Sequence, residues 1–183
     1  IEQREMQRMS KRIAPLTHKT YPAFFAENHI KIAIPKDFEI SVEKENLVVY
    51  WRRTKISDMG IIIHRGPLPQ DAAIIGGHVV PLRDSITKLY VPGARENSYM
   101  ITEDIIKPSI TPTEIAGNFA LETRGLWRTE GDIMGGPFVS YSIYDEENQQ
   151  LIYIDAFLLQ PDKKKRKTLF ELESVLSTFQ LTP

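Results

Sequence analysis

The chain has 183 residues, 42% hydrophobic and 26% charged, which is the composition of an ordinary soluble globular protein, so we expect one domain, with or without an appendage. Its formal net charge of −1 argues against a general nucleic-acid binder, which carries a strong basic excess. The absence of cysteine from the sequence excludes disulfides, thiol catalysis and thiolate metal sites.

The first residues already follow a helical pattern. An apolar stripe at helical spacing is formed by Met6, Met9, Ile13 and Leu16. The pattern runs from the first residue, without an initiator methionine or a signal peptide, so we expect an upstream portion that this sequence lacks. The stripe predicts contact with that portion or, if it is left exposed, a homodimer through the N-terminal helix.

A second, short helix is predicted from Pro22 to about Glu27, because proline suits a first turn and Asn28 suits a stop. We therefore expect an N-terminal helical segment over residues 1–28. A single α+β domain is expected over residues 29–183.

Extended segments then alternate with single helices. The predicted strands cover 30–34, 38–42, 47–51, 60–63, 98–102, 105–115, 118–130, 137–144 and 150–159. One helix is predicted by the spacing of Val79, Leu82, Ile86 and Leu89, and a closing helix by that of Leu169, Leu172, Leu176 and Phe179, with Asp162 as its N-cap. Strands in a row broken by single helices indicate an α+β fold, a twisted antiparallel sheet flanked by helices.

The sequence lacks the common catalytic and metal motifs. The histidines, His18, His29, His64 and His78, have no metal-ligand spacing, and no serine lies in a GxSxG elbow. We therefore expect no catalytic residue, no metal and no cofactor. The basic run Lys163 to Lys167 is expected to be the solvated first turn of the closing helix rather than a contact for phosphates or an anionic membrane.

The run from Glu122 to Pro137 is the strongest candidate for a functional site, because it combines arginines, a tryptophan, acids and glycines. In a regular strand Trp127 shares the core face, whereas Arg124 lies on the opposite polar face. A β-bulge at Gly125 would bring the two to one side. The candidate ligand- or partner-binding residues are Arg124, Trp127, Arg128, Asp132 and Met134. The glycine-rich stretch from Gly131 to Pro137 is expected to be a wide turn or bulge between two strands.

Six short stretches together resemble one uncharacterised protein family. They are RDS, YVPG, SYM, TRGLW, GD and MGGPFVS, which begin at Arg83, Tyr90, Ser98, Thr123, Gly131 and Met134. The family comprises cell-envelope lipoproteins of the Bacteroidetes and is known only as domain of unknown function 4837, and this chain resembles its C-terminal portion. The resemblance implies a lipid anchor upstream of this chain and a place in the periplasm or at the outer membrane. It supplies no catalytic residue.

The order of strands and helices also resembles, more loosely, the PsbP-type proteins. The shared features are an IPKDF-like opening strand, a helix after three strands, a long antiparallel meander and a closing helix. This resemblance implies an α/β/α sandwich, a scaffold associated mostly with binding, although a fold does not determine function.

These observations predict a non-catalytic module that binds an envelope protein or polysaccharide and contacts a membrane only through a lipid anchor absent from this chain. One alternative is a hydrolase in which Glu130 and Asp132 divide the acid and base roles and Arg124 clamps an anion, which requires a concave pocket containing these groups. Another is a small-ligand carrier, which requires an apolar pocket of roughly a few hundred Å³.

Overall fold

The computed structural model describes residues 2–69, 76–161 and 163–182. Its helices are α1 (Glu2–Ile13), α2 (Ala23–Glu27), α3 (Val79–Tyr90) and α4 (Arg166–Leu176), with a 3-10 turn, η1 (Ala14–Leu16), after α1. Its strands are β1 (Ile30–Lys31), β2 (Glu39–Lys44), β3 (Leu47–Arg53), β4 (Asp58–Pro67), β5 (Tyr99–Thr102), β6 (Ser109–Ile115), β7 (Asn118–Glu130), β8 (Gly135–Asp145), β9 (Gln150–Leu159) and β10 (Gln180–Leu181).

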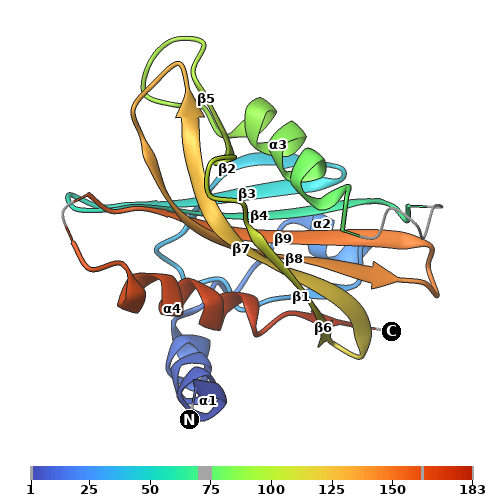
Figure 1. The fold of residues 1–183 in the computed structure, drawn as a ribbon. Helices are drawn as coiled ribbons and strands as arrows, with labels where there is room; N and C mark the ends of the chain where they lie inside the picture. Colours follow the sequence, from blue (N-terminus) through green and yellow to red (C-terminus); the bar gives the residue numbers. More distant parts are fainter. Residues whose placement is uncertain (1, 70–75, 162, 183) are drawn as a thin grey trace.

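Eight antiparallel strands form one curled sheet (Figure 1), in the order β2-β3-β4-β9-β8-β7-β5. The remaining strand of the eight, β6, also pairs with β7, over residues 118–124, while β5 pairs with β7 over residues 127–130. A separate ribbon joins β1 to β10, so the segment after α2 lies beside the end of the chain.

Helices cover both faces of this sheet (Figure 1), with α3 on one face and α4 on the other. On the α4 face, Leu172 and Val175 of α4 pack with Phe24 and Phe25 of α2 against apolar strand residues such as Ile61. On the α3 face, Ile86 packs in a second cluster with Val49, Ile62 and Phe157. The layers confirm the predicted fold class, an antiparallel sheet flanked by helices with an N-terminal helix.

Most predicted elements are confirmed, but the start of the closing helix is wrong. Helix α4 begins at Arg166, and Lys165 is its N-cap residue, so most of the basic run precedes the helix. The first turn of α4 still contains Arg166 and Lys167 and no acidic residue, so the cations there oppose the helix dipole. Asp162, the predicted N-cap, lies outside the described residues.

Two further differences concern single segments. Leu89 is 73% exposed, because the buried face of α3 follows Val79, Arg83, Ile86 and Thr87 instead of the predicted stripe. The glycine-rich stretch is only partly a turn, since Gly135, Gly136 and Pro137 belong to β8 and pair with β7. Glycine is required at position 136 because an added Cβ would lie 1.9 Å from the carbonyl oxygen of Leu158.

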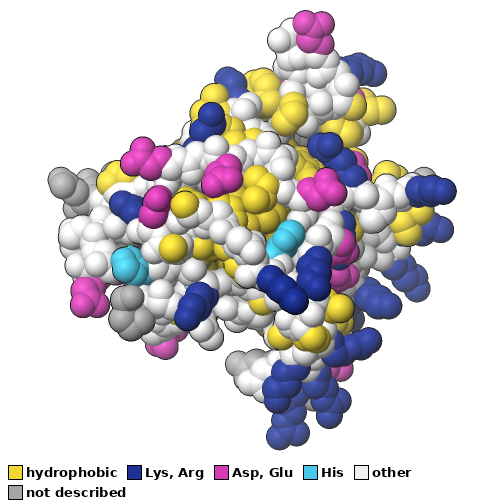
Figure 2. Space-filling model, turned by 180° about the vertical axis from the view of Figure 1, so that it is seen from behind, with side chains coloured by type: hydrophobic (Ala, Val, Ile, Leu, Met, Phe, Trp, Pro, Cys, Tyr) yellow, Lys and Arg dark blue, Asp and Glu magenta, His cyan; other side chains and the backbone are white. Residues whose placement is uncertain are grey.

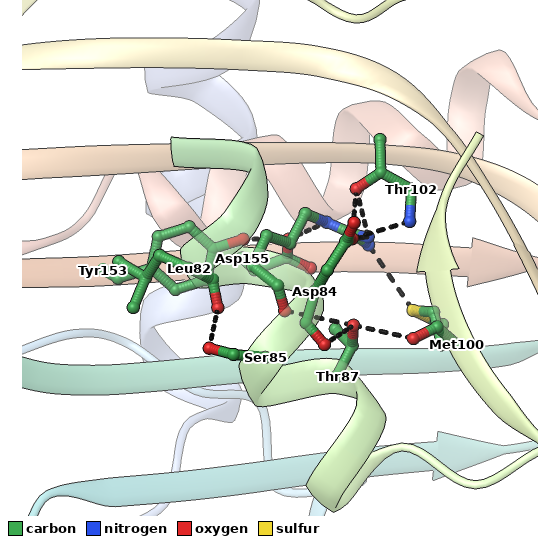
Figure 3. Close-up of polar contacts among 9 residues, drawn as sticks. Leu82, Asp84, Ser85, Thr87, Met100, Thr102, Tyr153 and Asp155 are labelled. Carbon is green, nitrogen blue, oxygen red and sulfur yellow. Dashed lines mark hydrogen bonds and ion pairs between the residues drawn. The ribbon is translucent and has the colours of Figure 1, made fainter. Parts of the chain in front are cut away.

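A buried polar network fastens α3 to the sheet (Figure 3). The side chain of Arg83 is fully buried, and its Nε donates to Oδ2 of Asp155 over 2.9 Å while its Nη1 donates to Oγ1 of Thr102 over 3.1 Å. Oδ1 of Asp84 accepts from the backbone N–H of Thr102 at 2.7 Å. The guanidinium also lies 3.8 Å from the ring centroid of Phe138, a cation–π contact. These contacts fix α3 to β5 and β9; Met100 of β5 and the segment that follows α3 line the pocket described below.

Candidate functional site

The central strand β7 is regular, so it separates the two residues that the sequence singled out. Its pairing with β8 runs without a shift from Ala120 to Arg128, and there is no bulge at Gly125. Trp127 therefore lies on the α3 face, in the same cluster as Phe157, whereas Arg124 lies on the α4 face. The alternative in which a bulge brings Arg124 and Trp127 to one side is wrong, because the ladder hydrogen bonds continue through Gly125.

The polar face of β7 is cross-linked within the protein. Arg124 donates through Nε to Glu122 at 2.6 Å and through Nη1 to Glu173 of α4 at 2.5 Å. Arg128 donates through Nη1 to Glu130 at 2.7 Å. These contacts pair opposite charges two residues apart along the strand, and they give Arg124 a structural partner on α4.

On the opposite face lies a small cavity, which we call the Trp127 pocket. Its volume is about 190 Å³. Its walls are made by Trp51, Arg53, Asp58, Val91, Pro92, Gly93, Ala94, Met100, Trp127, Thr129, Met134, Phe157 and Leu159. Three aromatic rings meet there, since Phe157 lies edge-on to Trp51 at 5.1 Å and to Trp127 at 6.1 Å between ring centroids.

Trp127 forms a buried part of the pocket wall. Trp127 is 4% exposed, and its Nε1 has no hydrogen-bond partner among the described residues. Leaving a buried donor unpaired costs about 1–3 kcal/mol. In the same lining, Arg53 stacks its guanidinium 4.6 Å from the ring centroid of Trp51. Asp58, also in the lining, lies opposite Arg53 in the register of the β3–β4 ladder. The pocket therefore combines aromatic rings with charged side chains in its lining.

Asp132 holds one wall of the pocket in place. Its Oδ2 accepts from the backbone N–H of Ala94 at 3.0 Å, and its Oδ1 accepts from the N–H of Ile133 at 2.8 Å and lies 3.6 Å from Nε of Arg95. The amides of Ile133 and Ala94, together with the charge of Arg95, lower the pKa of Asp132. Asp132 thus ties the β7–β8 turn to the loop that follows α3.

The structure brings together three of the five residues predicted from sequence. Trp127 and Met134 line the Trp127 pocket and Asp132 fixes its wall, whereas Arg124 and Arg128 face the other side of the sheet. Sequence reasoning missed Trp51 and Phe157, which reach the pocket from β3 and β9. A signal existed for Trp51: it is one of the two tryptophans of the chain and ends an apolar strand beside two arginines.

The described part of the chain contains no group of three or more His, Asp or Glu side chains that could hold a metal ion. No helix within residues 2–69, 76–161 and 163–182 is long and apolar enough to cross a membrane. Two other cavities are present, a groove beside α1 and a shallow hollow between the β3–β4 turn and the start of the basic run. Neither of these nor the Trp127 pocket is lined by Glu130, Asp132 or Arg124.

Solved structures with a similar fold come from distant proteins. The Ran-binding protein Mog1p of Saccharomyces cerevisiae is 11% identical with a TM-score of 0.53, and the match covers 84% of this chain and 90% of that chain. A Mog1 mutant gives the same identity and TM-score over 91% of its chain. LpqN of Mycobacterium tuberculosis, involved in cell envelope biogenesis, is 12% identical with a TM-score of 0.47 over 84% of this chain and 83% of that chain. At 11% identity, the likeness to Mog1 shows the fold alone.

No curated protein matches the chain. A family model described as a domain of unknown function matches residues 18–178, nearly the whole chain and all the strands of the sheet. On this match, the chain belongs to the family described as Domain of unknown function (DUF4837).

Proposed function

We propose that this chain is a non-catalytic binding module of the cell envelope and that the Trp127 pocket holds one sugar ring of an envelope polysaccharide. The observation that carries the proposal is the meeting of Trp51, Trp127 and Phe157 around one small pocket that is also lined by the charged residues Arg53 and Asp58.

The size of the pocket favours one ring of a larger partner. At about 190 Å³ it is smaller than the sites that enclose a whole drug-sized ligand. The partly exposed ring of Trp51, packed against the buried rings of Phe157 and Trp127, suits the apolar face of a sugar ring. The Arg53 guanidinium would donate hydrogen bonds to the sugar and the Asp58 carboxylate would accept them. Hydroxyl groups, which both donate and accept, match these two side chains.

The expected affinity for a single ring is low. A ring of about 12 non-hydrogen atoms, at about −0.3 kcal/mol per atom, gives about −4 kcal/mol, a millimolar dissociation constant. Useful affinity would then come from several rings of one polymer or from several copies of the module on it.

The rival hydrolase receives no support from the geometry. It needs Glu130, Asp132 and Arg124 in one concave site, but Glu130 is paired with Arg128, Asp132 is bound to backbone amides, and Arg124 is bound to α4. Each of these groups therefore has a structural contact of its own.

The cell-envelope location, the lipid anchor and an origin in the Bacteroidetes are proposals supported by the family resemblance of the sequence. Subcellular fractionation of a source cell, with mass spectrometry of the mature N-terminus, tests them.

A homodimer through the N-terminal helix also stays a prediction. Met9 and Ile13 pack against the chain's own core, which leaves Met6 and the 62% exposed Leu16 to meet a second copy. Light scattering of the wild type and of Leu16→Glu decides between monomer and dimer.

The binding proposal is tested on an array of bacterial surface oligosaccharides. We expect the wild type to bind a subset of glycans, Trp127→Phe to lose at least tenfold in binding, and Arg124→Ala, on the other face, to keep it. A folded wild type that binds no glycan would overturn the choice of ligand. A protein captured by cross-linking from envelope extracts and lost with Trp127→Phe would instead make the pocket a protein-binding site.

A further inference from the structure

A second candidate binding site lies far from the Trp127 pocket, between α1 and the β1–β10 ribbon. We call it the α1 groove. Its volume is about 1000 Å³, at the upper end of the range for ligand sites. One wall is formed by α1 and η1, and the other by β1 and the segment after it. The lining residues are Met6, Gln7, Ser10, Lys11, Ala14, Thr17, His18, Tyr21, Phe25, Ile30, Lys31, Ile32, Ala33, Ser177, Thr178 and Gln180.

The hydroxyl groups of this groove are already used by the protein. Ser177 donates to the carbonyl of Ser174 at 2.8 Å, and Thr17 donates to that of Ala14 at 2.9 Å. Thr178 donates to Val175 at 2.6 Å and accepts from the N–H of Ala33 at 2.8 Å. The hydroxyl of Tyr21 accepts from the N–H of Ile34 at 3.2 Å. These polar groups are satisfied, so the walls present mainly methyl, methylene and ring carbons to a ligand.

The charges that line the groove are of one sign. Lys11 on α1 and Lys31 on β1 are both exposed, and the lining contains no aspartate or glutamate. Arg4, Arg8 and Arg12 are also exposed on α1. Figure 2 shows Lys and Arg side chains gathered over the protruding α1 at the foot of the molecule. An apolar channel with a cationic rim complements a molecule that has an apolar chain and an anionic head.

We infer that the α1 groove binds a single-chain anionic amphiphile, with its alkyl chain along the apolar walls and its carboxylate or phosphate head between Lys11 and Lys31. The volume meets the requirement of the small-ligand carrier considered from sequence. The positive charge of the rim, in addition, specifies an anionic head group for that ligand. A neutral alkyl chain would gain burial but no ion pair, and a cationic head would be repelled.

The inference is tested by calorimetric titration of the full chain with palmitate, laurate, cetyl alcohol and cetyltrimethylammonium. We expect palmitate to bind at least tenfold more tightly than cetyl alcohol, and cetyltrimethylammonium to bind most weakly. Laurate, four methylenes shorter, should bind at least tenfold more weakly than palmitate, because each buried methylene contributes about 0.8 kcal/mol. Equal affinity for the three head groups would overturn the role of the lysines.

Four variants distinguish binding in the α1 groove from nonspecific attraction to positive charge and from binding in the Trp127 pocket. Lys11→Gln with Lys31→Gln should weaken palmitate about tenfold and leave cetyl alcohol unchanged. Lys55→Gln with Lys107→Gln, which removes the same charge elsewhere, should change neither. Ala14→Trp, at an exposed position of the lining, should block all the amphiphiles, and Trp127→Phe should block none. Absence of palmitate binding by the folded wild type, or equal loss in both lysine pairs, would contradict the inference whatever the outcome for glycans.

Discussion

Nε of Arg83 donates to Oδ2 of Asp155 over 2.9 Å, and both side chains are fully buried between α3 and the sheet. Burial raises the pKa of Asp155, while the charge of Arg83 and the hydroxyl of Tyr153 oppose the shift. A buried carboxylate and a buried guanidinium are tolerated here because each compensates the other. This pair fixes the helix whose following loop forms one wall of the Trp127 pocket.

Breaking the pair should be far more harmful than replacing it. Asp155→Ala leaves the guanidinium buried without its carboxylate, so we expect a loss of about 3–5 kcal/mol in the free energy of unfolding. Arg83→Met with Asp155→Leu removes both charges and should recover most of that loss. Urea denaturation followed by circular dichroism measures all three proteins. A double variant no more stable than Asp155→Ala would show that the network acts through more than its charges.

Glu122 should give the protein part of its sensitivity to acid. Burial alone would raise the pKa of Glu122, but hydrogen bonds from Arg124 and Tyr141 and the charge of Arg124 lower it overall. Because the pKa is lower in the folded state, this group stabilises the fold above the unfolded pKa of about 4.3, and the contribution is lost as the pH falls through the folded pKa.

Glu122→Gln should therefore lower stability at pH 7 by about 1 kcal/mol, a modest amount because Arg124 is 40% exposed and partly screened. The difference from the wild type should shrink when unfolding is measured below about pH 4. Glu114→Gln, at an exposed position on β6, is the control. A wild-type advantage that stays constant down to the lowest pH would contradict this assignment.

The absence of a side chain at Gly60 leaves the space that the ring of Phe157 occupies beside Trp51 and Trp127. An added Cβ at this position would lie 2.0 Å from Cζ of Phe157, so the ring would have to leave its contacts with Trp51 and Trp127. We expect Gly60→Ala to cost about 1–3 kcal/mol and to change the near-ultraviolet circular dichroism of the aromatic cluster. Gly66→Ala, in the same strand, meets the movable ring of His64 at 3.1 Å and should have a small effect. Equal spectra for the two variants would show that the missing side chain of Gly60 does not determine the position of the Phe157 ring.

Much of the fold could be predicted from the sequence because strand periodicity and turn residues are local signals. The alternation along β7 correctly separated Trp127 from Arg124, and the proline and asparagine around α2 marked its ends. The start of α4 was missed because the prediction rested on a single cap residue, whereas the helix begins at Arg166 without a side-chain cap.

The candidate site was only partly predictable because it depends on contacts between distant strands. Trp51, Trp127 and Phe157 meet only after β3, β7 and β9 take their places in the sheet, and local patterns do not specify that order. The burial of Arg83 had a weak signal, since Asp155 is the only charge within the apolar strand β9 and needs a partner. A charged residue inside an apolar strand is thus a sign that a residue of opposite charge is buried beside it.

The central claim, that the Trp127 pocket receives one sugar ring, is tested most directly by NMR. The chain has two tryptophans, so its ¹⁵N spectrum should show two indole N–H signals, and Trp127→Phe assigns them. On adding a glycan selected from the array, we predict that the Trp127 signal moves more than the Arg124→Ala variant changes it, because the sugar ring packs in the pocket that Trp127 lines. An unmoved Trp127 signal at a saturating glycan concentration would contradict the account.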